Sequence, residues 1–251
     1  MFQQVRGLIQ VMFFFEYEIK DNNEIIITNY FGTDTELKIP SEINGKSVTS
    51  IGNEAFIYSI GFTSIIIPNS VANIGIGALM GYGSTLKNIS VDKENKYFSS
   101  EDGILFNKDK SELLCYPCQK KDESYVIPDS VINIREFSFY NCSRLKSVII
   151  PNTVTSIENW AFSGCDDLII YGYKDSYAET YANEELIQFK DINNQTLNIE
   201  NPKVNDNTSS QEIETTKTNN SNISIIVILL ISIGIIILLW ILLIIAKRKN
   251  K

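Results

Sequence analysis

The sequence predicts an α+β repeat solenoid, built mostly of short stacked strands in about five to six coils. One observation behind this prediction is a recurring sequence motif, in which an Ile-Pro pair is followed by Val, by Ile, and by a small residue next to a large apolar one. Its copies begin at Ile39-Pro40, Ile67-Pro68, Ile127-Pro128 and Ile150-Pro151. A second observation is their spacing, because Ile51 and Ile74 lie 23 residues apart, as do Ile134 and Ile157.

This period lies within the range of leucine-rich repeats. A unit of this length cannot bury its apolar side alone, so the copies must stack, and stacking creates a broad surface suited to binding. Within each copy we expect a short strand that ends at the proline, which has no N–H to donate. In the last copy Leu145, Val148 and Ile150 should point inward, and the Ala161-Phe162 pair should fill the interior from the opposite side.

The repeat domain is predicted to span residues 15–190 and to carry a cap at each end. Phe15 to Thr28 alternates around the turn-forming segment Asp21 to Asn23, which predicts a β-hairpin covering the first coil. Ser176 to Glu185 opens with capping-box spacing and predicts a short helix. Strand-like sequence from Leu186 to Phe189 then closes the domain.

The third copy departs from the pattern. Asp92 stands where the other copies have proline, and the chain makes an excursion from Tyr97 to Tyr116. Within it, Ile104 to Phe106 and Leu113-Leu114 flank the polar segment Asn107 to Lys110, which predicts a projecting hairpin. Such an insertion either belongs to a binding surface or covers a structural edge.

Three segments are predicted to follow the repeats. Residues 191–222 are rich in Asn, Thr, Ser and acidic residues, which predicts a disordered stalk. Residues 223–246 carry no charge, and at about 1.5 Å per residue a helix of this run reaches roughly 36 Å, enough to cross a bilayer core. Residues 247–251 form a basic tail. Because basic flanks stay in the cytoplasm, we expect a single-pass protein of the cell membrane with its repeats outside and its C-terminus inside.

The beginning of the chain gives weaker support to this topology. Residues 1–14 are apolar with Arg6 near their start, and they resemble part of an export signal without an evident cleavage site. An uncleaved, degenerate or mis-started signal would fit this pattern. A tail-anchored protein with its repeats inside the cell therefore stays an alternative.

Composition excludes several classes of function. The chain has no histidine, so the commonest general base and metal ligand are both missing. Its net charge is −8, and because the tail is basic, the remainder is still more acidic. Such a surface should repel nucleic acid and anionic lipid. We therefore expect neither an enzyme nor a bound cofactor or metal, and no nucleic-acid partner.

The four cysteines fall into two pairs. Cys142 and Cys165 hold the same place in successive copies, so they should lie about 5 Å apart, either as a disulfide or as a ladder of buried thiols. Cys115 and Cys118 have the spacing of metal and redox sites, but there is no second pair and no histidine. An incidental pair explains them better than a metal or redox site.

One row of residues is the candidate binding site. In each strand the residue between two inward positions should face outward, and stacked coils should align these residues as a single stripe. The stripe consists of Lys38, Ile66, Ser90, Val126 and Ile149. It is partly apolar, which suits a protein partner, although β-branched residues also suit any strand.

Leu145 to Cys165 reads Leu-x-x-Val-x-Ile-Pro-x-Thr-Val-x-x-Ile-x-x-x-Ala-Phe-x-x-Cys and resembles the BspA-like leucine-rich repeat. Ile39 to Gly52, Tyr97 to Leu114 and Tyr171 to Tyr181 resemble further segments common in that family, so the resemblance covers roughly residues 15–190. It implies a cell-surface protein of bacteria or parasitic protists. Members of this family are associated with adhesion to host proteins, extracellular matrix or other cells, and the family supplies no catalytic residues.

Two functions therefore compete. The first is a membrane-anchored surface protein whose repeats bind host, matrix or cell-surface proteins in adhesion or recognition. The second is a tail-anchored intracellular scaffold for protein interactions. A third, an enzyme, would depend on Cys115 and Cys118 alone.

Overall fold

The computed structural model describes residues 14–59, 61–80 and 85–194. All of them belong to one compact unit, Met1–Asn198. The apolar N-terminal segment before Phe14, the stalk beyond Asn194, the predicted membrane span and the basic tail lie outside the described residues. Among the residues that are described, no helix is long and apolar enough to cross a membrane.

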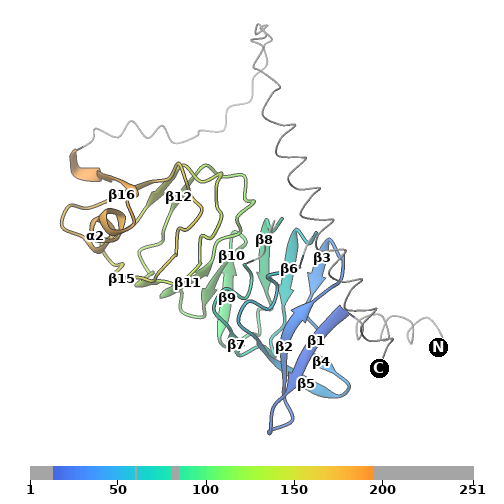
Figure 1. Ribbon diagram of the computed structural model, residues 1–251. Coiled ribbons are helices and arrows are strands. Elements are labelled where there is room, and N and C mark those ends of the chain that lie inside the picture. Colours follow the sequence, from blue (N-terminus) through green and yellow to red (C-terminus); the bar gives the residue numbers. More distant parts are fainter. Residues whose placement is uncertain (1–13, 60, 81–84, 195–251) are drawn as a thin grey trace, which may run out of the picture. The chain divides into compact units, whose positions relative to one another are not determined.

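The described chain forms a leucine-rich-repeat β-solenoid with one short helix (Figure 1). Two parallel sheets, here called the front sheets, lie along one side. The first front sheet contains β3 (Glu36–Lys38), β6 (Ser64–Ile67) and β8 (Asn88–Val91), and the second contains β12 (Ser124–Val126), β14 (Ser147–Ile149), β16 (Ile169–Gly172) and β17 (Gln188–Asp191).

These strands give about seven turns over the described residues, more than the five to six coils that the sequence predicts. The reason is β17, which the sequence predicts only as a closing strand. In the structure β17 pairs in parallel with β16, from Ile169 opposite Gln188 to Gly172 opposite Asp191, and so adds a rung. A 3₁₀ turn, η1 (Ile192–Asn194), follows it.

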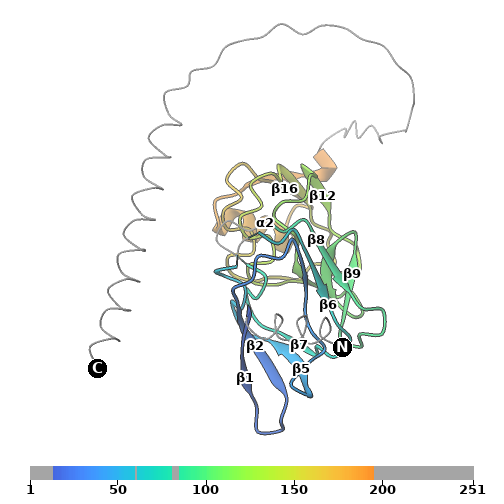
Figure 2. The same cartoon turned by 90° about the vertical axis from the view of Figure 1, so that its right-hand side faces the viewer.

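Two further sheets, here called the back sheets, supply the strands on the opposite side of the solenoid, and the second of them also reaches across to the front strand β8 (Figure 2). The first contains β1 (Phe15–Ile19), β2 (Ile25–Tyr30), β4 (Glu42–Ile43), β5 (Lys46–Ile51) and β7 (Asn73–Ile74). The second contains β9 (Phe98–Glu101), β10 (Ile104–Asn107), β11 (Glu112–Cys115), β13 (Asn133–Ile134) and β15 (Ser156–Ile157).

The predicted N-terminal hairpin is present as β1 and β2. β2 also pairs in parallel with β5, so this arm is itself a rung of the solenoid. Its Ile25 and Ile27 are fully buried, whereas Ile19 at the end of β1 is 52% exposed. The alternating sequence pattern therefore matches the burial of side chains along β2 better than along β1, because β1 pairs with another strand along only one edge.

Every regular coil bends at a residue with left-handed backbone, which stands just before the small and large apolar pair. These residues are Glu54, Gly77, Phe137 and Trp160, with φ between 52° and 61°. Both members of each following pair are buried, as predicted for Ala161 and Phe162. The sharp bend is therefore a property of the repeat, whatever residue stands there.

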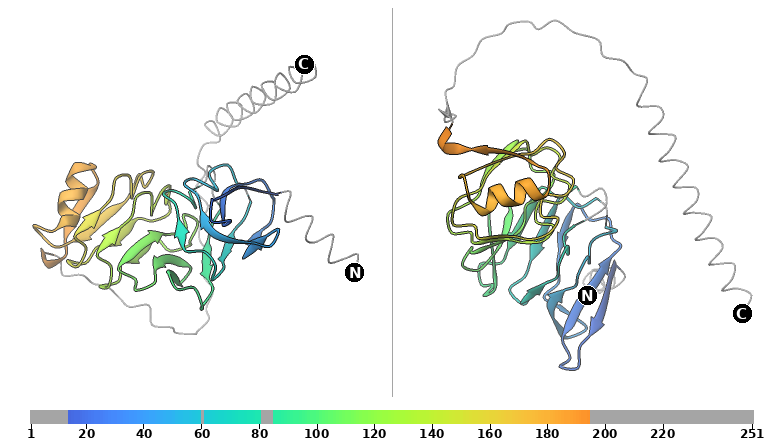
Figure 3. Two further views of the ribbon diagram at one scale, coloured as in Figure 1. Left: turned by 90° about the horizontal axis from the view of Figure 1, so that it is seen from below. Right: turned by 60° about the vertical axis from the view of Figure 1, so that its left-hand side comes forward.

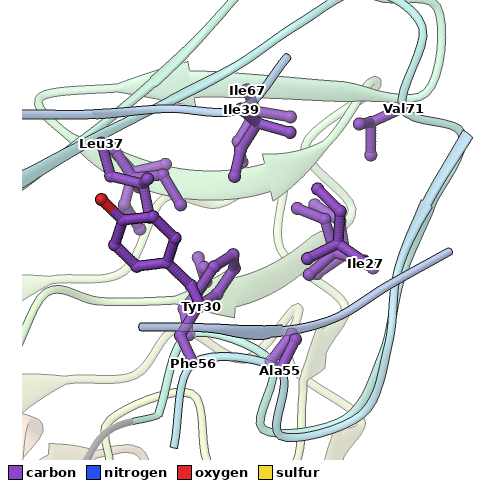
Figure 4. Packing of buried hydrophobic residues seen from close by; sticks show 14 of the residues in the cluster. Ile27, Tyr30, Leu37, Ile39, Ala55, Phe56, Ile67 and Val71 are labelled. Carbon is purple, nitrogen blue, oxygen red and sulfur yellow. The ribbon is translucent and has the colours of Figure 1, made fainter. Parts of the chain in front are cut away.

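The interior consists of two clusters of buried side chains, one for each half of the solenoid. Figure 4 shows the N-terminal cluster, where Ile27 and Tyr30 of β2 lie with Phe56 and Ile67 from later parts of the chain. In the C-terminal cluster the ring of Phe139 stacks on that of Phe162, with centroids 4.6 Å apart. Short strands hold together because each coil fills the space left by its neighbours.

The excursion is not a projecting hairpin, so that prediction is wrong. β9, β10 and β11 form an antiparallel meander, and β11 joins the solenoid by pairing in parallel with β13. Side chains on both faces of β10 are buried: Leu105 belongs to the N-terminal cluster, while Ile104 and Phe106 belong to the C-terminal one. A strand that is apolar on both faces gains most when covered on both sides, so it partitions the two clusters.

A buried asparagine anchors the start of this meander. The Asn95 side-chain amide donates to the carbonyl oxygens of Pro68 and Val71, at 2.8 and 2.9 Å. Its side-chain oxygen accepts from the backbone N–H groups of Tyr97 and Phe98, both at 2.8 Å. All of its hydrogen-bonding capacity toward the protein is used, so it can lie fully buried and tie the meander to the preceding coil.

The predicted helix is α2 (Tyr177–Glu184), which packs against β16 and β17. The side chain of Ser176 accepts a hydrogen bond from the N–H of Glu179, and the Glu179 carboxylate accepts one from the N–H of Asp175. Ala178, Tyr181 and Ala182 are buried beneath the helix. Capping thus sets where the helix begins, and its apolar side fixes it to the last coil.

Candidate protein-binding face

The front sheets place the predicted site residues in rows on their outer surface. Lys38 lies opposite Ile66, and Ile66 lies opposite Ser90. Val126 lies opposite Ile149 in the second front sheet. Neighbours along the chain, such as Ile67, Val148 and Ile150, are fully buried, so the inward and outward alternation follows the predicted register.

The five residues form two rows rather than one stripe, which corrects the expectation of a continuous line. The free edge of β8 is covered by the meander, because the N–H of Ile89 donates to the carbonyl of Gly103 at 2.9 Å. Gly103 has φ +77°, and a Cβ there would lie 2.5 Å from the side-chain oxygen of Asn88, so glycine is required for this close approach. The sequence leaves two roles open for the excursion, binding a partner or covering a structural edge, and this contact supports the second role.

The row in the second front sheet continues beyond the predicted residues. Ile149 lies opposite Tyr171, and Tyr171 lies opposite Lys190. The ammonium group of Lys190 lies 5.5 Å from the centroid of the Tyr171 ring, a cation–π contact. Neither residue is in the predicted row, which ends at the last full copy, although the Leu168 to Tyr171 segment repeats the same alternation.

The two front sheets differ in outward chemistry. In the second, Val126, Ile149, Ile169 and Tyr171 face outward beside four polar positions, and we call these four residues the apolar strip; the polar positions are Ser124, Ser147, Gln188 and Lys190. Val126 is 58% exposed and the other three are half-buried. In the first front sheet the outward positions are mostly polar, with Ile66 as the exception; they are Glu36, Lys38, Ser64, Ile66, Asn88 and Ser90. Because strand propensity acts equally on both sheets, it does not account for this difference.

The four cysteines are free thiols. Cys142 donates to the carbonyl of Tyr116 at 3.7 Å, and Cys165 donates to the carbonyl of Phe139 at 3.2 Å. Ser59, at the corresponding place in an earlier coil, donates its hydroxyl to the carbonyl of Tyr30 at 2.8 Å. This position therefore favours a small side chain that donates a hydrogen bond to the preceding coil. A thiol can donate this bond, and a disulfide cannot. Of the two alternatives for these cysteines, the structure has the thiol ladder.

In the Cys115 and Cys118 pair, the Cys115 thiol is not activated. Burial raises the pKa of Cys115 to about 12, so its thiol stays protonated at neutral pH and is a poor nucleophile or ligand. Among the described residues, no group of three or more Cys, Asp or Glu side chains is placed to hold a metal ion.

Comparison with known proteins agrees with this architecture. The family described as the BspA type leucine rich repeat region matches residues 15–107 and 114–228, in six copies. A search of curated protein sequences finds no match.

Several solved structures are similar to this chain. The pneumococcal vaccine antigen PcpA is 27% identical over 54% of this chain and 38% of its own, with a TM-score of 0.42. A leucine-rich repeat protein from Eubacterium ventriosum is 17% identical over 64% of this chain and 71% of its own, with a TM-score of 0.41. One from Bacteroides ovatus is 20% identical over 71% and 51%, with a TM-score of 0.42. The chain thus spans less than half the length of PcpA. Since the family match extends over most of its residues, the chain belongs to the BspA-type leucine-rich-repeat family.

Proposed function

We propose that this chain is a membrane-anchored cell-surface protein whose repeats bind a host, matrix or cell-surface protein through the apolar strip. Leucine-rich repeats of this family generally serve protein interaction. The observation that carries the proposal is the contrast between the two front sheets, because only the second presents several apolar side chains on a continuous outer surface. Interfaces gain affinity mainly from such side chains, when a partner removes them from water.

The partner chemistry follows from the strip and its border. Three aliphatic side chains offer contact area, and Tyr171 adds a ring with a polar hydroxyl, a residue type enriched at interfaces. Lys190 at one end of the row adds a positive charge to a chain that is acidic overall. We therefore expect a partner that buries an apolar patch on the strip and places an acidic group near Lys190.

In this proposal the remaining segments deliver the repeats to the surface. The β1–β2 hairpin and α2 act as caps, residues 191–222 act as a stalk, residues 223–246 cross the membrane, and residues 247–251 stay in the cytoplasm. The support is the composition of these segments: a polar stretch, an uncharged run of sufficient length and a basic tail.

Protease shaving of intact cells tests the location. The repeats should be digested together with known surface proteins, while a cytoplasmic marker stays intact. Repeats that survive complete digestion of the surface markers would contradict the outside location and favour the tail-anchored intracellular scaffold. The free state of the four cysteines suits that alternative, because thiols persist in reducing compartments.

Cell adhesion tests the strip. Ile149→Lys should lower adhesion to immobilised host or matrix protein at least fivefold, because it places a charge in the middle of the apolar contact. Ile66→Lys is the matched control, since it makes the same change at an outward position of the first front sheet. Both variants must be displayed at the level of the unmodified protein. Undiminished adhesion by the Ile149→Lys protein would exclude the strip as the binding site.

A further inference from the structure

A second surface feature lies at the end of the solenoid, where α2 lies across the last coil (Figure 3). It is a cavity of about 560 Å³, here called the end cavity, within the size range of ligand sites. Its lining comes from the bend of the last coil, the loop that follows it, and the segment after α2. The lining includes Trp160, Asp166, Asp167, Ile169, Glu185 and Leu186.

Two large apolar side chains at this cavity are exposed to solvent. Trp160 is 53% exposed and Leu186 is 92% exposed. Both residues have left-handed backbone with φ 56°, a conformation that bulky residues seldom adopt. At the Trp160 position other coils carry Glu54 or Gly77, so the repeat does not require an aromatic residue there. Neither side chain is explained by burial in the core.

The cavity is also acidic. Asp166, Asp167 and Glu185 line it, and none of the described lining residues is Lys or Arg. Asp167 is already bound from outside the cavity by Lys146, at 2.8 Å, which lowers the pKa of the Asp167 carboxyl. Within the described part of the chain, the side chains of Asp166 and Glu185 make no ion pair. Two exposed carboxylates are therefore available to a cation.

Trp160 stacks on a single aromatic ring of the preceding coil, on the outside of the solenoid. Its indole lies on the ring of Phe137, with centroids 5.4 Å apart and an angle of 20° between the planes. In a longer solenoid the next coil would cover the other face of the indole, but here α2 replaces that coil. A planar group from another molecule can take this place.

We propose that the end cavity binds an arginine side chain of a protein partner. The guanidinium stacks on the face of Trp160 that Phe137 leaves uncovered and forms charged hydrogen bonds with Asp166 and Glu185, while Leu186 contacts an apolar neighbour of the arginine. Arginine fits better than lysine because its cation is planar, stacks on aromatic rings and donates two parallel hydrogen bonds to one carboxylate.

The end cavity adjoins the face described above. Ile169 belongs to the apolar strip and also lines the cavity, so one partner can cover the strip and insert its arginine at the end of the solenoid. This inference rests on the proposed function, because it names the chemistry of the partner that the function requires. The peptide experiment below requires neither surface display nor the strip, so either proposal can fail while the other stands.

The probe is the capped peptide acetyl-Gly-Leu-Arg-Leu-Gly-amide, titrated calorimetrically into the full chain in non-ionic detergent. We expect saturable binding at one site. The citrulline analogue, which keeps the planar group without its charge, should bind at least tenfold more weakly, and the lysine analogue should fall between the two. Equal affinity for the arginine and citrulline peptides, or no binding of the arginine peptide, would overturn the proposal.

Variants locate the site. Asp166→Asn combined with Glu185→Gln should lower the affinity for the arginine peptide about tenfold. Glu123→Gln combined with Asp129→Asn removes the same charge at exposed positions outside the cavity lining and should change the affinity less than twofold. An equal loss in both double variants would mean that only the overall charge attracts the peptide, which contradicts a built site.

The aromatic contact needs a variant that still folds. Trp160→Gly suits the left-handed position, since Gly77 occupies it in another coil, and it should lower the affinity at least fivefold. Trp160→Phe keeps a ring and should retain most of the binding. If Trp160→Gly binds the peptide as well as the unmodified chain does, with the same circular dichroism spectrum, the proposed stacking is wrong.

Discussion

The N-terminal and C-terminal halves of the solenoid share one backbone pattern but fill it differently. In the C-terminal interior, Tyr116, Phe139, Phe162 and Tyr181 form an aromatic ladder, with successive centroids 5.1, 4.6 and 5.9 Å apart. In the N-terminal interior, Tyr30 and Phe56 lie 6.3 Å apart, and Leu79 occupies the corresponding place in the next coil. The repeat thus requires a large apolar side chain at this position and does not require an aromatic one.

The outer surfaces of the two halves also differ. The first front sheet carries polar residues around Ile66, including a Lys38–Glu36 ion pair at 3.2 Å, while the second carries the apolar strip and borders the end cavity. Inward positions are constrained in both halves because they form the core. Outward positions are free to differ, and the contrast between the halves is the observation that supports the proposed binding at the second front sheet.

The largest expected effect tests the inward register that both halves share. Ile150→Lys should unfold the domain, because it buries an unpaired charge at a fully buried position. Ile149→Lys, one residue away on the outer surface, should change the free energy of unfolding by only about 0.5 kcal/mol. Thermal melts followed by circular dichroism measure both variants. Equal melting temperatures would contradict the strand register.

The aromatic ladder gives the next largest effect. Phe162→Ala should cost about 3 to 5 kcal/mol of unfolding free energy, since it empties a place between the rings of Phe139 and Tyr181. Leu79→Ala in the other half should cost less, nearer to about 2 kcal/mol, because a smaller side chain is lost. Urea denaturation gives both values. A loss below about 1 kcal/mol for Phe162→Ala would mean that this residue is not part of the core.

The thiol ladder gives a smaller effect. Cys165→Ser should be tolerated within about 1 kcal/mol, because Ser59 makes the same hydrogen bond in the N-terminal half. Cys165→Val should cost more than Cys165→Ser despite its similar size, because the carbonyl of Phe139 loses a donor. Urea midpoints of the two variants decide this, and the opposite order would show that the hydrogen bond does not matter.

The smallest effect expected is none at all. Because the cysteines are free, a reductant should leave the melting temperature unchanged. Alkylation of Cys115 by iodoacetamide near pH 8 should stay slow until urea unfolds the domain, since its thiol has a pKa of about 12 in the folded state. A melting temperature that falls in reductant would reveal a disulfide and contradict the ladder.

The sequence by itself determined the coil register, the inward side chains and the start of the helix. These features depend on local chemistry that repeats: proline follows the front strand in four copies, aliphatic residues mark the inward positions, and the Ser176 and Glu179 pair caps α2. Because most copies carry the same signal, the copies reinforce one another. The repeat pattern alone therefore assigns Ile150 and Phe162 to the core, where both are buried.

Only the tertiary structure decided where the excursion packs and how the candidate binding residues are arranged. The Ile104 to Phe106 segment reads equally well as an exposed hairpin or a buried strand, and only the two cores on either side of it show that it is buried. The same meander divides the predicted stripe at β8. The end cavity joins Trp160, Asp166 and Glu185 from separate segments, and no spacing along the chain predicts that meeting, because α2 must first fold back across the last coil.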